Sequence, residues 1–402
     1  MESSPKPTII YFDHNATTPI RPEVFEAMRP FLAPDGVFGN PSSIHAEGRR
    51  ARAALEKARD TVAGFVGAAD PSEIIFTSSG TEADNMAIVG AAFQHRDKGR
   101  LIVSSAVEHH AVLHACDYLA KEHGFRVASI SADEFGRVSP EGFAKVCADD
   151  AILVSVMTAN NEVGTIQPVE EIGNLCRERG VLFHTDAVQA AGKIPINVKE
   201  WPVDMLSISG HKLYAPKGIG ALYIRRGVRL HALIHGGVHE RDRRAGTENV
   251  AGAVGLAAAC EAAGREMASE GKRIKGLRDR LEKGLLEGIP GGRLNGHPTM
   301  RLGNTSHLSF DGVDGESLIM ALDQPGFTLH EEGLPSIAAS TGAACSAGIL
   351  EPSHVLAAMG LSKDRVRGGV RFSLGRGNTE AEVDAALDII PRLVKRLRDA
   401  IR

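Results

Sequence analysis

The sequence predicts an α/β protein with a large, mostly parallel sheet covered by helices and a smaller α+β domain. Short apolar runs alternate with amphipathic stretches over about the first 260 residues, which is the pattern of strands joined by crossover helices. Of the 402 residues, 44 are glycine and 43% are hydrophobic, as expected for many tight strand–helix turns around a sizeable core. The strands are apolar along their whole length, which favours a parallel sheet buried on both faces.

The first part of the chain alternates between predicted helices and strands. Residues 42–67 predict a long helix. Residues 74–77 predict a strand that leads through Ser78-Ser79-Gly80 into a helix, which a capping-box-like sequence opens at 81–84. Further buried strands are predicted at 101–103, 152–156, 181–185, 205–209 and 219–224. In such a sheet, ligands bind beyond the carboxyl ends of the strands.

The pattern changes after about residue 260. Two charged helices are predicted at 250–270 and 273–287, followed by strands at 305–310 and 370–374 and a C-terminal helix with a capping box. The stretch 323–340 has the least regular pattern. We therefore expect a large domain at 15–262, and a small domain that combines 1–14 with 263–402 and carries the loop around Cys345.

Composition narrows the class of protein. The net charge is −4, with 46 basic and 50 acidic residues, so charge gives no support to nucleic-acid or membrane binding. No apolar run approaches 18 residues, and the N-terminus lacks the basic and apolar regions of a secretory signal. The five cysteines are odd in number and show no metal-ligand spacing. We expect free thiols in a cytoplasmic protein without a cysteine-based metal site.

Lys212 stands where a predicted strand ends in Ser209-Gly210-His211-Lys212. A lysine at this place can form a Schiff base with an aldehyde cofactor such as pyridoxal phosphate. The side chains of Ser209 and His211 would suit the phosphate of that cofactor. A single lysine after a strand is more often a surface residue, so the interpretation depends on other strand-end residues.

Several strand ends supply groups that such a cofactor needs. Gly80-Thr81 at a helix N-terminus can hold a phosphate, although ordinary helix capping explains the same pattern. Asp186 follows a strand, and a carboxylate there can keep a pyridine nitrogen protonated. Gln189 could reach the same ring. Asn161, in a segment that also has the composition of a turn, could donate to the phenolic oxygen of the cofactor.

Three further residues have chemistry that suits a substrate. His109 follows a strand, and its imidazole can stack on a planar ring or carry protons. Arg371 alternates with apolar residues, so its guanidinium suits either a substrate carboxylate or a salt bridge. Cys345 lies in a loop of small residues, where its thiol can attack a bound substrate or can simply fill a small apolar space.

Ten segments, in order along nearly the whole chain, resemble the NifS/IscS-type cysteine desulfurases. They are 11–19, 39–43, 77–85, 108–109, 160–164, 184–189, 209–212, 244–249, the Cys345 loop with 350–354, and 371–376. Each segment alone is weak evidence, but the ordered set is specific. The resemblance implies a homodimeric, pyridoxal phosphate-dependent enzyme of the class V aminotransferases, with the transferase fold of type I.

The family's residue roles carry over to matching positions of this sequence. Lys212 would hold the cofactor and, with His109, move protons, and Cys345 would accept the sulfur. L-cysteine would become L-alanine and leave a persulfide on Cys345, which then passes to a partner protein. The remaining roles implied are Asp186 at the pyridinium; Gln189 and Asn161 at the phenolic oxygen; His109 stacked on the ring; Gly80, Thr81, Ser209 and His211 at the phosphate; Thr247 reaching the phosphate of the other subunit; and Asn15 and Arg371 at the substrate carboxylate.

One departure and several alternatives stay open. Residues 327–336 form a longer stretch before the cysteine than the family usually has, which bears on loop reach, substrate access or partner docking. A selenocysteine lyase uses the same scaffold, and another aminotransferase or β-lyase would make Cys345 incidental. A non-catalytic subunit of sulfur assembly is a fourth reading. The sequence also leaves the sulfur acceptor open: it could serve general iron–sulfur cluster assembly, nitrogenase maturation or tRNA thiolation. Whether iron–sulfur clusters are bound transiently is a separate open question.

Overall fold

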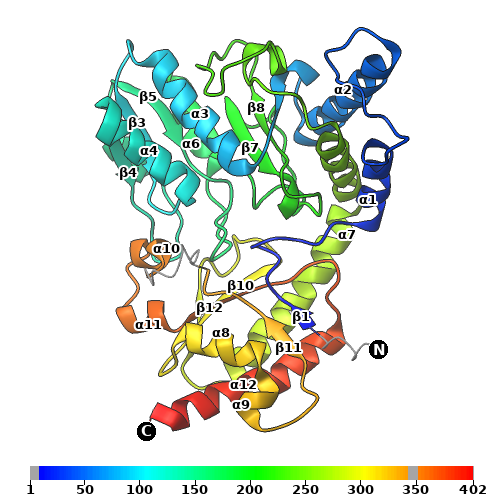
Figure 1. The fold of residues 1–402 in the computed structure, drawn as a ribbon. Coiled ribbons are helices and arrows are strands. Elements are labelled where there is room, and N and C mark those ends of the chain that lie inside the picture. Colours follow the sequence, from blue (N-terminus) through cyan, green and yellow to red (C-terminus); the bar gives the residue numbers. More distant parts are fainter. Residues whose placement is uncertain (1–8, 343–351, 402) are drawn as a thin grey trace.

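A seven-stranded sheet forms the centre of the larger part of the molecule (Figure 1). The computed structural model describes residues 9–342 and 352–401. The strand order is β2 (Ile74–Thr77), β8 (Gly220–Ile224), β7 (Met205–Ser209), β6 (Leu182–Asp186), β5 (Ala151–Ser155), β3 (Leu101–Ser105) and β4 (Arg126–Ile130). Only β8 runs antiparallel to its neighbours in this sheet. The prediction of a mostly parallel sheet is therefore confirmed.

Both faces of this sheet are covered by helices, because successive side chains of each strand point to opposite faces. On β3, Leu101 and Val103 pack into one apolar cluster and Ile102 packs into another. The first cluster includes residues of α2 (Ala46–Val66), α5 (Pro140–Val146), α6 (Val169–Arg179) and α7 (Val250–Gly288); the second includes residues of α3 (Gly80–His95) and α4 (His110–His123).

The smaller part has its own sheet and its own apolar core. Strand β10 (Thr305–Phe310) lies between β9 (Gly292–Asn295) and β12 (Gly369–Ser373), and both pairings are antiparallel. Strand β1 (Ile9–Tyr11) pairs with β11 (Ser336–Ala338), so the N-terminal segment lies beside the C-terminal part of the chain (Figure 1). The remaining helices are α1 (Pro22–Met28), α8 (Gly315–Asp323), α9 (Pro325–Leu329), α10 (His354–Ala358), α11 (Lys363–Arg367) and α12 (Glu380–Ile401).

Two expectations about local structure are wrong. The two helices predicted at 250–270 and 273–287 are one continuous helix, α7, which joins the two parts of the molecule (Figure 1). Gly271 does not break it, because α7 packs on α2 at one end and on α12 at the other. The irregular stretch 323–340 contains α9 and β11. The boundary that we propose at residue 262 falls inside α7.

The predicted capping box of the last helix is confirmed. The Thr379 amide donates to Glu382 Oε2 at 2.8 Å, and the Glu382 amide donates to Thr379 Oγ1 at 3.3 Å. The helix predicted from residue 42 instead begins at Ala46, because the His45 side chain caps it by accepting a bond from the amide of Gly48. Within the described ranges, no helix is both long and apolar enough to cross a membrane.

A strained turn at residues 240–242 is held by a buried ion pair. Glu240, Arg241 and Asp242 have φ angles of 46°, 56° and 62°, in the left-handed region that costs a non-glycine residue about 1–2 kcal/mol. Arg59 on α2 donates to both oxygens of Glu240, at 2.6 and 3.0 Å, and the Phe76 amide donates to Oε2 at 3.1 Å. These bonds fix the start of the segment that leads to Thr247.

We expect Arg59→Met to lower the free energy of unfolding by about 3–5 kcal/mol, because it leaves the buried Glu240 carboxylate without its partner. Urea unfolding followed by circular dichroism measures this loss. Arg50→Met is the matched control, since Arg50 lies on the same helix in an exposed pair with Glu47 and should change stability by no more than about 0.5 kcal/mol. Equal losses in the two variants would contradict the role of the buried pair.

Candidate active site

A pocket of about 460 Å³ lies beyond the carboxyl ends of β5, β6 and β7, between the large sheet and β12. This is where ligands bind in sheets of this kind. The residues that line it are Asn15, Ala16, Ser79, Gly80, Thr81, Asp84, His109, Met157, Ala159, Asn161, Asp186, Val188, Gln189, Ser209, His211, Lys212, Ser340, Gly342 and Arg371. Every predicted site residue except Thr247 and Cys345 is among them.

Lys212 ends the short 3-10 turn that follows β7. Its Nζ donates to the carbonyl oxygens of Asn15, at 2.5 Å, and Ala16, at 2.7 Å. Desolvation and the positive charge of Arg371 lower the pKa of Lys212 to about 8, against the opposing effect of Asp13 and Asp186. A useful fraction of the amine is therefore unprotonated near neutral pH, as a nucleophile requires.

Asp186 is the last residue of β6, and its side chain is buried. The Val188 amide donates to its Oδ1 at 2.8 Å, and burial raises the pKa of Asp186 to about 6. Asp84 on α3 also lines the pocket, and its Oδ1 has no hydrogen-bond partner although it is buried. Burial and the nearby Asp186 raise the pKa of Asp84 well above its ordinary value. A cationic ring nitrogen at Asp186 would relieve this excess of buried carboxylates.

The N-terminus of α3 forms part of the pocket wall and could act as a cradle for a phosphate. A Cβ on Gly80 would come within 2.7 Å of Val188 Cγ2 and 3.2 Å of Ser209 Cβ, so any larger residue would push Val188 or Ser209 out of place in the pocket wall. Gly80 and Thr81 start α3, whose free amide groups and dipole favour an anion. Ser209 and His211 line the same pocket, and their binding of the phosphate stays a prediction.

His109 lies at the N-cap of α4. Its Nδ1 accepts a hydrogen bond from the Ala111 amide at 3.1 Å, so the neutral ring carries its proton on Nε2. Desolvation, with the charge of Lys212 as the next largest cause, lowers the pKa of His109 to about 4. The ring is therefore uncharged at neutral pH and can face an aromatic ring without the cost of burying a cation.

Arg371 makes a salt bridge, which is one of the two roles that the sequence leaves open for it. Its Nη2 lies 2.7 Å from Asp13 Oδ1, and Nη1 donates to the Asn161 carbonyl at 2.9 Å. Its Nε is buried without a hydrogen-bond partner, and Arg371 is one of the residues that line the pocket.

Asn15 uses its side-chain amide within the protein. Its Nδ2 donates to Asn161 O at 3.1 Å and to Thr305 Oγ1 at 2.9 Å, and its Oδ1 accepts from Asn304 at 2.9 Å. Binding of a substrate carboxylate by Asn15 would require these bonds to rearrange, and it stays a prediction. What Asn15 contributes directly is its backbone carbonyl, which binds Lys212.

Two predicted residues are not among the residues that line the pocket. Thr247 is exposed and does not line the pocket of its own chain. Cys345 lies outside the described residues, but Ser340 and Gly342, which precede it, line the pocket. The sequence reasoning did not assign roles to Asp13, Asp84 or Lys193. Asp84 had a visible signal, since it is an acidic residue among apolar positions of α3.

Comparisons with known proteins place this pocket in a family context. Residues 10–386 match the family described as "Aminotransferase class-V". A protein of Methanosarcina thermophila named "Cysteine desulfurase IscS" is 50% identical over 390 residues, which cover 97% of this chain and 93% of that protein. "Cysteine desulfurase NifS" of Azotobacter vinelandii is 45% identical over 390 residues, which cover 97% and 94% of the two chains.

Solved structures show the same likeness. A chain described as "NIFS-LIKE PROTEIN" is 39% identical, has a TM-score of 0.87, and is matched over 96% of this chain and 99% of that chain. A structure described as "SspA in complex with cysteine" is 35% identical with a TM-score of 0.77, and the match covers 91% of this chain and 98% of that chain. The similarity thus includes both parts of the molecule and the pocket between them.

We expect the lowered pKa of Lys212 to appear in its reactivity. In cofactor-free protein, reductive methylation of Lys212 should increase through about pH 8, because the neutral amine becomes the main form above its pKa. The exposed Lys217 is an internal control for the labelling. Peptide mass spectrometry after brief labelling across a pH series measures both. Parallel profiles for the two lysines would show that Lys212 is not activated.

Proposed function

The chain belongs to the class V aminotransferase family and is a cysteine desulfurase, and from this premise we propose how its own residues divide the reaction. Lys212 carries pyridoxal phosphate, the cofactor on which this family depends, and Cys345 receives the sulfur of L-cysteine as a persulfide. The single observation that supports this division best is the pocket itself. It joins Lys212 and the buried Asp186 to the segment that leads to Cys345.

The pocket residues fit the cofactor in charge and shape. The Gly80 cradle would accept the phosphate, with Thr81, Ser209 and His211 around it, and Asp186 would keep a proton on the ring nitrogen. Gln189 and Asn161 line the same pocket and would donate to the phenolic oxygen. When bound, pyridoxal phosphate supplies an aldehyde that condenses with amines and a ring that accepts electrons from the bound amino acid.

Protons move through two groups of this chain. The Nζ of Lys212 has a lowered pKa, so it can take up a proton and return it near neutral pH. His109 is neutral and carries its proton on Nε2, which makes that atom a donor toward the pocket. Arg371 lines the pocket, and its guanidinium would bind the carboxylate of the substrate.

The sulfur transfer balances without any further reagent. The thiolate of Cys345 attacks the sulfur of L-cysteine, the carbon–sulfur bond breaks, and its electron pair stays on the carbon. That carbon takes a proton, which gives L-alanine, and Cys345 keeps the sulfur as a persulfide. We propose that a sulfur-acceptor protein in the cytoplasm, such as an iron–sulfur scaffold, then takes the persulfide sulfur.

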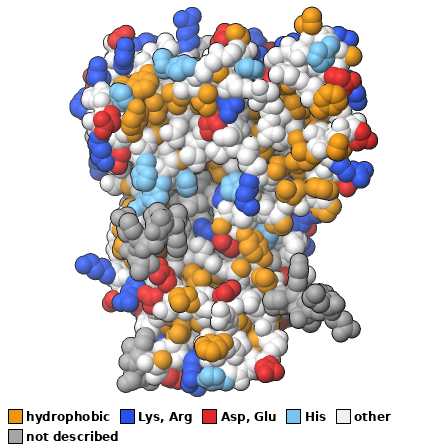
Figure 2. Space-filling view, in the orientation of Figure 1, with side chains coloured by type: hydrophobic (Ala, Val, Ile, Leu, Met, Phe, Trp, Pro, Cys, Tyr) orange, Lys and Arg blue, Asp and Glu red, His pale blue; other side chains and the backbone are white. Residues whose placement is uncertain are grey.

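We also propose that the active protein is a homodimer. Large apolar side chains are exposed at Ile20, Phe25, Leu32, Phe38 and Ile44. Figure 2 shows apolar side chains gathered on the α1 side of the molecule. A monomeric protein rarely exposes so many large apolar side chains together to water, and a second copy of the chain would cover them. Thr247, which is exposed and outside its own pocket, would then reach the phosphate in the other subunit.

Mass spectrometry of the holoenzyme after L-cysteine tests the sulfur transfer. We expect the peptide with Cys345 to gain the mass of one sulfur atom, which dithiothreitol removes. Cys345→Ser should retain the visible absorbance of the cofactor and lose alanine formation by at least about a hundredfold, because the nucleophile is gone. Cys116→Ser is the control, since that thiol is buried. Full activity of Cys345→Ser would remove Cys345 from the mechanism.

The same holoenzyme also distinguishes a cysteine desulfurase from the nearest alternative, a selenocysteine lyase. We expect alanine release from L-cysteine at a steady rate with a sulfur acceptor present. Negligible turnover of L-cysteine beside rapid turnover of L-selenocysteine would overturn the assignment.

Sedimentation equilibrium tests the dimer. We expect a mass of twice the 42.7 kDa chain at micromolar concentration. Phe25→Glu, on the exposed side of α1, should shift the protein toward the monomer, because it buries a charge in the interface. Met320→Glu is the matched control, since Met320 is exposed on α8, away from the α1 side. A monomeric parent protein would contradict the proposal.

A further inference from the structure

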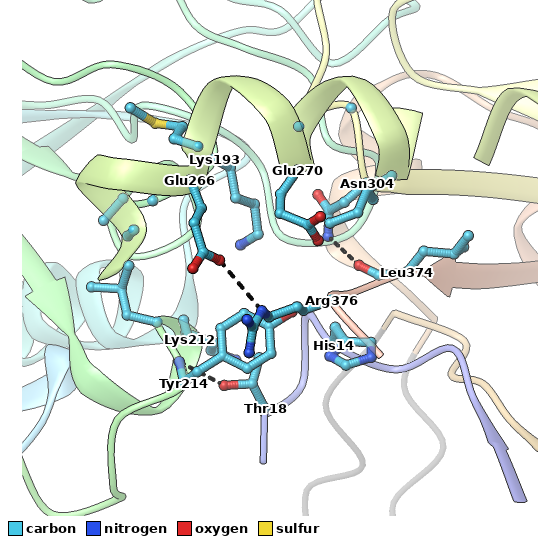
Figure 3. Close-up of a pocket in the computed structure, with 18 of the residues that line it drawn as sticks. His14, Thr18, Lys193, Lys212, Tyr214, Glu266, Glu270, Asn304, Leu374 and Arg376 are labelled. Atoms are coloured by element: carbon cyan, nitrogen blue, oxygen red, sulfur yellow. Dashed lines mark hydrogen bonds and ion pairs between the residues drawn. The ribbon is translucent and has the colours of Figure 1, made fainter. Parts of the chain in front are cut away.

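A second cavity shares the lining residue Lys212 with the cofactor pocket. This rear cavity has a volume of about 270 Å³, and both Lys193 and Lys212 line it (Figure 3). Glu266 and Glu270, from α7, form another part of its wall. Figure 3 shows the side chain of Lys193 pointing toward the centre of the cavity. Placing a partly buried lysine in the same cavity as Lys212 costs desolvation energy, so Lys193 is a candidate for a specific role.

Lys193 is bound to Gln189. Its Nζ donates to the backbone oxygen of Gln189 at 2.9 Å and to the side-chain Oε1 at 3.1 Å. At its other end, the Gln189 amide donates from Nε2 to the carbonyl of Asn15 at 2.9 Å. The ammonium of Lys193 can only donate, and the carbonyl of Asn15 can only accept. The two ends together therefore leave a single orientation for the Gln189 amide.

That orientation has a consequence for the cofactor pocket. Gln189 lines the pocket, and Nε2 carries two hydrogens, of which Asn15 takes one. The second N–H is available to a ligand oxygen. The same Asn15 carbonyl also accepts from Lys212 at 2.5 Å. Lys193, Gln189, Asn15 and Lys212 thus form one connected hydrogen-bonded set that runs from the rear cavity to the reactive amine.

We propose that Lys193 is a positioning residue, which holds the Gln189 amide so that its free N–H faces the phenolic oxygen of the cofactor. The inference rests on the proposed function, in which pyridoxal phosphate occupies the pocket on Lys212. In this role Lys193 touches neither the cofactor nor the substrate and acts through Gln189.

The charges around Lys193 are compatible with this role. Burial, followed by the positive charges of Lys212 and Arg371, lowers the pKa of Lys193 to about 7. A neutral amine still has two N–H groups, and the two bonds to Gln189 need only two. Deprotonation of Lys193 therefore leaves the amide held, and the positioning persists on both sides of neutral pH.

The visible absorbance of the bound cofactor reports on this N–H. The proton on the nitrogen that joins Lys212 to the cofactor is shared with the phenolic oxygen, and a donor at that oxygen stabilises its charge after the proton leaves. We expect Lys193→Met to raise the apparent pKa of the absorbance change by about one pH unit, since a hydrogen bond to a charged group is weakened. Lys193→Arg, which keeps a donor, should lie between Lys193→Met and the parent. Lys199→Met, which changes an exposed lysine nearby, should leave the titration unchanged.

A double-mutant cycle separates positioning from a simple loss of charge. If Lys193 acts through Gln189, then Gln189→Ala alone should reproduce the shift, and Lys193→Met should add nothing to it. Equal shifts from Lys193→Met in the parent protein and in Gln189→Ala would show that Lys193 acts only through its charge, which would overturn the proposal. An unchanged titration in Lys193→Met would overturn it as well. If Lys193→Met does not fold, Gln189→Ala with and without Lys193→Arg completes the comparison. A parent protein without any cofactor absorbance would instead overturn the proposed function.

Discussion

Parallel pairing of β6 with β7 is the constraint on which the site depends. The register places Asp186 opposite Ser207, so both strands end at one edge of the sheet, and the turn that follows β7 carries Lys212 there. No local sequence signal could bring an aspartate and a lysine 26 positions apart into one pocket. The parallel arrangement does so, and it adds the N-terminus of α3 as a binding place for an anion.

Burial then gives these side chains their reactivity. Removal from water lowers the pKa of amines and imidazoles and raises the pKa of carboxyl groups. In this pocket, the pKa of Lys212 falls to about 8 and that of Asp186 rises to about 6, so both titrate close to neutral pH. The buried Asp84 beside them favours a cationic ring nitrogen, which accounts for the fit of the pocket to a pyridine cofactor.

The sequence predicted the fold class and most of the pocket, because strand ends carry recognisable polar residues and because the ordered motifs match a known family. It did not predict that α7 is one helix, since packing against α2 and α12 overrides the local effect of Gly271. Lys193 was missed for a similar reason. Its role depends on hydrogen bonds to Gln189, and a lysine after two alanines and a glycine has no pattern that distinguishes it from a surface residue.

The location of the lysine that carries the cofactor tests the account most directly, because two lysines lie close to the pocket. Borohydride reduction of the holoenzyme makes the link to the cofactor permanent, and peptide mass spectrometry then locates it. The account predicts one pyridoxyl group per chain on Lys212 and loss of the visible absorbance. A pyridoxyl group on Lys193, or on any other lysine, would contradict the assignment on which the mechanism and the role of Lys193 both depend.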